Sequence, residues 1–172
     1  VSVRGVTASD EVRVSTIEDD MIHGRLEAID ATAFAAIIGE RLAERLGVEP
    51  GDRFRLSTAG GISRQIKVVG LFRTGVVSTD ESLVYVRLRT AQVLAGRWNA
   101  INDIRIRLDD AGEARRVAAR AEALLGYKAV SWQEANESLL EAFQVRNVIM
   151  YTVVAAILVV AGFGIFNIVS II

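Results

Sequence analysis

The last twenty-five residues, 148–172, contain no charged side chain, although the chain has 20 basic and 21 acidic residues. A helix rises about 1.5 Å per residue, so this run reaches about 37 Å, enough to cross a hydrocarbon core about 30 Å thick. A buried core helix rarely stays uncharged over such a length. We therefore predict a membrane-spanning helix at 148–172 and an extramembrane domain at 1–147, with a buried hairpin or core helix as the alternative.

The composition of the remaining chain excludes several classes of partner and chemistry. The formal net charge is −1, and no basic stripe with interleaved aromatic residues occurs, so we expect no nucleic-acid partner. The absence of cysteine excludes disulfides and thiolate chemistry. The chain begins at Val1 rather than at a methionine and has no charged flank after the apolar run, so we expect an excerpt of a longer membrane protein.

Enzyme motifs are missing from the sequence, including G-x-x-x-x-G-K-[ST], G-x-G-x-x-G and G-x-S-x-G. Gly60-Gly61 lies between two predicted strands, which favours a hairpin over a phosphate site. The only histidine, His23, is near Asp19 and Asp20, but one imidazole with loop carboxylates is normally just solvated. Asp109-Asp110 precedes a predicted helix, which favours capping over paired catalytic acids. We predict no catalytic residue, no cofactor and no metal site.

Hydrophobic periodicity predicts strands and short helices in the first hundred residues. The predicted strands lie near 1–6, 35–38, 53–57, 62–72 and 83–86, with a helix and loop over 10–24 and short helices over 40–46 and 90–95. Gly47 is placed to end the first of these short helices, Pro50-Gly51 to form a turn, and 59–61 to close a hairpin.

The segment 102–130 has the pattern of a strand, a helix and a second strand. Isoleucines and a leucine alternate with arginines over 102–108. Asp110 and Glu113 form a capping-box pattern before an apolar stripe at helical spacing, and 128–130 supplies a short strand. A unit of this kind needs further strands to cover its helix.

The predicted fold class is therefore α+β, with two subdomains followed by a long helix that continues into one membrane span. One subdomain is discontinuous and combines the first strands with 102–130. The other is a small β-rich insertion over 38–97.

The final helix begins at a second capping-box pattern formed by Ser131 and Glu134. No proline occurs from Trp132 to Ile172, and the first glycine in that stretch is Gly162. We predict one unbroken helix from 132 to 172. Such a rod transmits movement between the domain and the membrane, whereas a flexible linker does not.

Small and polar side chains gather on one side of the predicted span. An α-helix turns about 100° per residue, and this spacing places these side chains on one face. Small and polar side chains on one face permit close helix packing and interhelical hydrogen bonds. The alternative is that Asn167 borders a substrate path, because polar groups within a span are often functional. The candidate residues for a transport path or for helix packing are Phe143, Met150, Thr152, Gly164, Asn167 and Ser170.

Three groups of residues together form a recognisable pattern. The first is Ile37-Ile38-Gly39-Glu40-Arg41-Leu42-Ala43 with Leu46-Gly47-Val48 and Gly51-Asp52. The second is Val69-Gly70-Leu71-Phe72 with Gly75, Asp80 and Val84-Tyr85-Val86. The third is Ser131-Trp132-Gln133-Glu134 with Asn136, then Phe166-Asn167-Ile168-Val169-Ser170. In this order and spacing, the chain resembles the extracytoplasmic core domain of MacB-type and lipoprotein-releasing ABC transporter permeases.

This resemblance implies a role that the residues by themselves do not show. Permeases of this family carry four spans, with this domain between the first and the second on the periplasmic or outer face. They pair as homo- or heterodimers and are driven by a separate or fused ATPase. The implied location is the inner membrane, with residues 1–147 outside. The implied partners are an ABC ATPase subunit, a second permease, membrane lipid and a periplasmic partner protein.

The expected function is that of a permease subunit whose outer domain couples ATP-driven movement to the extraction of a lipoprotein, a lipid or another membrane-associated substrate. One departure from the family matters here. Lipoprotein-releasing permeases that recruit a periplasmic carrier use a long hairpin loop that contains proline, whereas 58–63 is short and has none. This difference argues against carrier recruitment by this loop and against a lipoprotein as the substrate. The alternative function is the extracytoplasmic sensor domain of a membrane signalling receptor, which also feeds a helix into the membrane.

Overall fold

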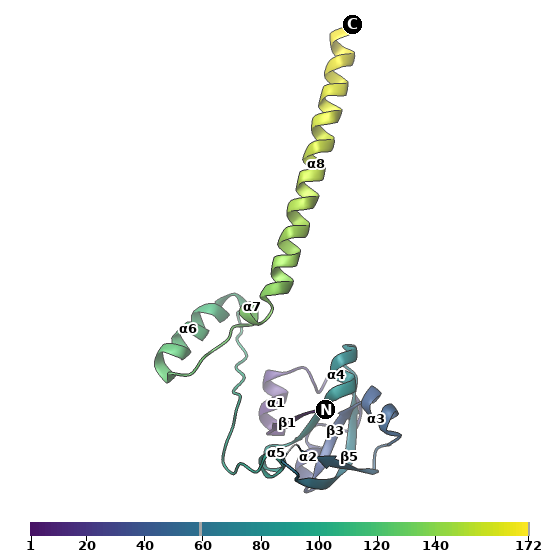
Figure 1. Ribbon diagram of the computed structural model, residues 1–172, viewed down its shortest axis with the longest axis vertical. Helices are drawn as coiled ribbons and strands as arrows, with labels where there is room; N and C mark the ends of the chain where they lie inside the picture. The colour runs from purple at the N-terminus through teal and green to yellow at the C-terminus, as the bar shows by residue number, and fades with distance from the viewer. Residues whose placement is uncertain (59, 172) are drawn as a thin grey trace. The chain divides into compact units, whose positions relative to one another are not determined.

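The computed structural model of the chain describes residues 1–58 and 60–171, with side chains to residue 166. The chain forms two compact units, Val1–Arg107 and Leu108–Ile172. The first contains a sheet covered by short helices, and the second is helical (Figure 1). The expected class, an α+β domain followed by a long apolar helix, is confirmed.

A mixed six-stranded sheet forms the centre of the first unit. Its spatial order is β1-β6-β3-β5-β2, and β4 pairs with β5 off this path. The strands are β1 (Ser2–Val6), β2 (Met21–His23), β3 (Ala35–Gly39), β4 (Arg53–Ser57), β5 (Ser63–Phe72) and β6 (Leu83–Arg87). β3 is central and buried along its whole length, because its sequence Ala-Ala-Ile-Ile-Gly has no polar side chain to present to water.

Helices cover the sheet on both faces, and alternate strand residues point to the two cores. Ile38 and Val84 belong to one core, with Leu42 from a covering helix, whereas Ile37 and Tyr85 belong to the other, with Ile29. The helices of this unit are α1 (Ala8–Val14), α2 (Ala28–Ala31), α3 (Glu40–Leu46), α4 (Val77–Ser82) and α5 (Leu88–Ala95).

The turn signals in the sequence are confirmed. Gly47 ends α3 with a φ of 65°, the left-handed conformation that glycine adopts without strain. Gly51 also has a positive φ, of 108°, after Pro50. The N–H of Thr58 donates to the carbonyl of Ile62 at 2.9 Å and joins β4 to β5.

The strand pairing differs from the expected division into a discontinuous subdomain and an inserted one over 38–97. β6, from within the expected insertion, pairs in parallel with β1 and antiparallel with β3, so one sheet unites both parts. The period-2 pattern identifies a strand but carries no information on its neighbours. β2 was not predicted, because a strand of three residues gives too short a pattern to detect in the sequence.

The strands predicted at 102–108 and 128–130 are not formed. Both segments are irregular in the structure, and Ile104 and Ile106 are 70% and 65% exposed. Alternation produces a strand only where a neighbouring strand supplies hydrogen bonds. Asp110 does cap the following helix, because its carboxylate accepts from the N–H of Gly112 at 2.8 Å.

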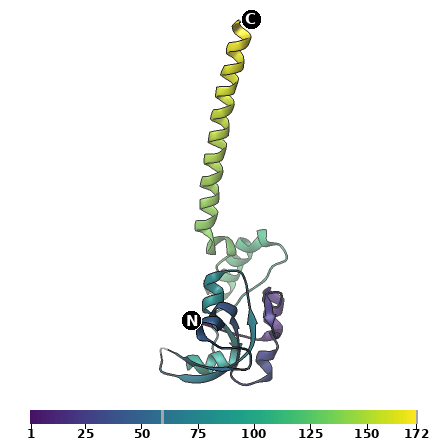
Figure 2. The same cartoon turned by 90° about the vertical axis from the view of Figure 1, so that its right-hand side faces the viewer.

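The second unit contains η1 (Ala111–Glu113), α6 (Ala114–Leu125), α7 (Trp132–Ala135) and α8 (Glu137–Ile171). The prediction of one unbroken helix from 132 is wrong at Asn136, where φ is −117° and ψ is 25°. From Glu137 onward the helix is continuous (Figure 2). Its stretch Glu137–Phe166 is long and apolar enough to cross a membrane.

Candidate functional site

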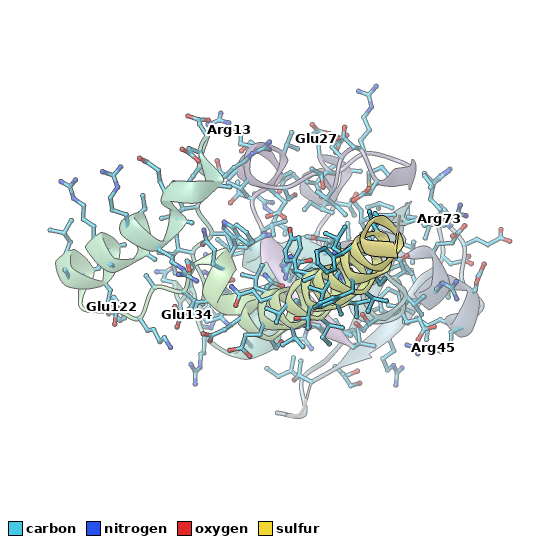
Figure 3. All side chains as sticks on the ribbon, turned by 90° about the horizontal axis from the view of Figure 1, so that it is seen from above. Arg13, Glu27, Arg45, Arg73, Glu122 and Glu134 are labelled. Carbon is cyan, nitrogen blue, oxygen red and sulfur yellow. The ribbon has the colours of Figure 1, made fainter. Side chains whose placement is uncertain are left out.

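The joint between α7 and α8 is the candidate functional site, because it connects α8 to the rest of the second unit. Ser131 begins α7 as its N-cap, and its hydroxyl accepts from the N–H of Glu134 at 3.2 Å. Ser131 is buried, unlike most residues of this unit. The carboxylate of Glu134 (labelled in Figure 3) lies 3.2 Å from the ammonium nitrogen of Lys128, in a salt bridge.

Two side chains of α7 hold this helix against the beginning of η1. The indole N–H of Trp132 donates to the carbonyl of Ala111 at 2.8 Å. The side-chain amide of Gln133 donates to the same carbonyl at 3.1 Å. A shared acceptor at the beginning of η1 therefore fixes the orientation of α7 within the second unit.

Asn136 sets the change of direction between the two helices. Its side-chain amide donates to the carbonyl of Trp132 at 2.8 Å and closes α7. Its own carbonyl accepts the N–H groups of Leu139 and Leu140, both at 3.1 Å, and opens α8. The break is thus hydrogen-bonded on both sides, so the joint is a defined bend rather than a loose linker.

The candidate residues of the span do not converge on one site. A helix turns about 100° per residue, so Phe143 and Met150 face roughly opposite to Thr152. The hydroxyl of Thr152 donates to the carbonyl of Val148 at 2.8 Å, and a Cβ at Gly164 would meet no atom within 4 Å. The side chains of Asn167 and Ser170 lie outside the described residues. The transport-path and packing roles of all six remain predictions.

Phe143 marks the end of the charged part of α8. The guanidinium of Arg146 lies 5.4 Å from the centroid of the Phe143 ring, in a cation–π contact. No charged residue follows Arg146. This pair therefore lies where the helix passes from water to the expected membrane.

A buried carboxylate organises the end of β5 and the start of α4 in the first unit. Asp80, 1% exposed, accepts from the N–H and the hydroxyl of Thr74, at 2.9 and 2.8 Å, and from the N–H of Gly75 at 3.2 Å. Gly39 lies so close that a Cβ there would be 2.1 Å from the carbonyl oxygen of Asp80. Residues that carry the family resemblance are thus packed against one another.

An ion pair at the surface joins the start of α3 to the end of β5. The carboxylate of Glu40 accepts two hydrogen bonds from the guanidinium of Arg73 (labelled in Figure 3). This hydrogen bonding lowers the pKa of Glu40 below its ordinary value and raises that of Arg73. Arg45 also donates to the carbonyl of Glu81 at 2.6 Å, so α3 is tied to α4.

Sequence reasoning missed one buried ion pair. Glu11 of α1 is 3% exposed and pairs with the guanidinium of Arg105, which raises the pKa of Arg105. The only signal was a carboxylate three residues after Ala8, on the buried side of a short helix. His23 is exposed in β2, and the described residues contain no group of three His, Cys, Asp or Glu side chains that could hold a metal.

A comparison with protein families decides the relationship of the chain. The model of the MacB-like periplasmic core domain matches residues 1–124. The chain belongs to this family. The resemblance read from the sequence motifs is therefore confirmed.

Curated relatives of the chain are permease subunits. The chain is 31% identical over 176 residues to the lipoprotein-releasing system transmembrane protein LolC of Neisseria meningitidis, covering 95% of this chain and 42% of that protein. It is 25% identical over 179 residues to LolC of Xylella fastidiosa, covering 98% and 42%. The chain thus spans less than half the length of these relatives.

A solved structure is also similar. The extracellular domain of the noncanonic ABC-type transporter YknZ from Gram-positive bacteria is 20% identical and covers 75% of this chain, with 67% of its own chain covered. The TM-score is 0.47.

Proposed function

We propose that residues 1–172 are the outer domain and the following span of an ABC transporter permease. The observation that carries this proposal is α8, which runs from a hydrogen-bonded joint through an apolar stretch long enough to cross a membrane. Movement of α8 in the membrane reaches the domain through the joint at Asn136. Family membership favours this role over the sensor-receptor alternative.

The proposed substrate is a membrane-associated molecule with a lipid part. Its support is the name of the LolC relatives, which belong to lipoprotein-releasing systems. The β4–β5 hairpin turns within 58–62 and contains no proline, so we assign no carrier-protein docking to it. Energy comes from an ABC ATPase subunit or domain, since the chain contains no nucleotide-binding motif.

The proposed assembly is a permease homo- or heterodimer in the inner membrane, with residues 1–147 on the periplasmic or outer side and in contact with lipid at the span. A cysteine introduced at Ser78, which is exposed on α4, tests the sidedness in a full-length permease that has no other cysteine. A membrane-impermeant maleimide added to intact spheroplasts should label this position. Labelling only after lysis would reverse the proposed orientation.

Reconstitution tests the function itself. The full-length permease and its ATPase are placed in proteoliposomes that carry a fluorescent lipid-modified protein or a fluorescent phospholipid. ATP should drive release or extraction of at least one of them, and an ATPase variant that cannot hydrolyse ATP should abolish it. If neither substrate moves while ATP is hydrolysed, the proposed function is wrong.

A further inference from the structure

The segment 102–107 has the residue pattern of a strand, yet no described strand pairs with it. Ile104 and Ile106 leave 70% and 65% of their surface in water. Burying such apolar surface is favourable. Alternating aliphatic residues in this state are typical of a strand whose neighbour comes from elsewhere.

β1 is a second element with an open side. It lies at the edge of the sheet and, within the described residues, pairs only with β6. An edge strand presents a row of free N–H and C=O groups that another strand can pair with. Within the described residues, the first unit therefore offers one strand-like segment, 102–107, that has no partner and one strand, β1, that has a free edge.

A cleft of about 260 Å³ is bordered by both segments. Its walls include 4–7 at the end of β1, 103–105 and Glu11 of α1. Gly5 contributes backbone atoms to this cleft, whereas a Cβ at this position would point to Ala91 of α5. The ion pair between the buried Glu11 and the half-buried Arg105 ties the segment 103–105 to α1, so this part of the cleft wall is held in place.

We propose that this cleft receives a β-strand from permease polypeptide outside residues 1–172. The backbone of that strand pairs with β1, and its apolar side chains cover Ile104 and Ile106. The strand is assigned to the same polypeptide because more than half of each LolC relative lies outside the region aligned to this chain. A strand in the same polypeptide also has a far higher effective concentration than one in a separate protein. The proposal does not depend on which substrate is transported.

Cysteine labelling of the full-length permease tests the proposal. Single cysteines replace Ile104 or Ile106 in a cysteine-free background, and Leu46 and Val77, which are 45% and 48% exposed, provide controls. A maleimide should react at least tenfold more slowly at 104 and 106 than at 46 and 77, and equally fast at all four after denaturation. Equal rates in the folded protein would overturn the proposal.

Hydrogen exchange of the same full-length protein gives an independent readout that needs no substitution. The peptide 1–7 should be protected to the same degree as the peptide 83–87 of β6. Fast exchange of half the amides of β1 would show a free edge and overturn the proposal. Protection at 104 and 106 that disappears on dilution, or on removal of a partner subunit, would assign the strand to another chain and overturn it too.

Discussion

Single buried side chains fix the end of the sheet where α4 begins. Asp80 accepts three hydrogen bonds at one turn, and its backbone leaves no room for a side chain at Gly39. Neither residue has a catalytic environment. Both are better explained by the packing of α3 and α4 on the sheet than by chemistry at a site.

Replacement of Asp80 by alanine should destabilise the first unit. The N–H groups of Thr74 and Gly75 then lose their acceptor, which costs about 2 to 3 kcal/mol. We expect the melting temperature of the protein in detergent to fall by about 10 °C. Ser78→Ala, an exposed change on the same helix, should leave it unchanged. A melting temperature of Asp80→Ala equal to that of Ser78→Ala would refute the role assigned to this carboxylate.

The pair of Glu40 and Arg73 should make stability depend on pH in the acid range. Hydrogen bonding from Arg73 lowers the pKa of Glu40, so the folded state binds the proton less tightly than the unfolded state. The contribution to stability is present above the unfolded pKa and is lost as the pH falls through the folded pKa. Carboxyl NMR titration should place the pKa of Glu40 below its ordinary range. Arg73→Gln should raise it, and Arg53→Gln should not.

At the scale of elements, sequence patterns located most strands and helices but not how they meet. β3 and β6 were detectable because continuous apolar runs have few alternatives, and α3 because Gly47 ends it. The order of the strands in the sheet was not detectable from the sequence, because pairing depends on partners far along the chain. Of the joint, Ser131 was predicted as the N-cap, whereas the break at Asn136 was missed. No proline or glycine marks that break, and the contact that holds α7 in place, from Trp132 to Ala111, joins residues 21 positions apart.

Trp132→Phe should loosen the joint without unfolding the domain. It removes the indole N–H that donates to Ala111, a contribution of about 1 kcal/mol, while keeping an aromatic ring. Hydrogen exchange in 109–116 and 131–137 should become about fivefold faster. Tyr127→Phe, a change at an aromatic residue that is 79% exposed, serves as the control. Unchanged exchange in both segments would show that the bend does not rest on this hydrogen bond.

At the scale of the whole molecule, the break at Asn136 shortens the lever expected from the sequence. The long helix begins at Glu137, and the four residues of α7 belong instead to the part that is hydrogen-bonded to Ala111. About ten residues of α8 then lie between the joint and the charge-free stretch, a rise of about 15 Å. In the proposed function, movement in the membrane reaches the joint through this short stretch, so its stiffness is the property to test.

Ala142→Pro places a helix breaker in that stretch. Proline at 142 removes a backbone hydrogen bond inside α8 and costs about 3 kcal/mol or more. We expect the complete transporter to hydrolyse ATP at a normal rate while transport per ATP falls, and the outer domain to stay folded because 142 lies beyond its last strand. Ala142→Ser, which keeps the N–H, and Glu137→Gln should both couple normally. Substrate transport and ATPase activity measured together in reconstituted vesicles give the ratio. If Ala142→Pro leaves transport per ATP unchanged, α8 acts as a tether, and movement reaches the outer domain by another route.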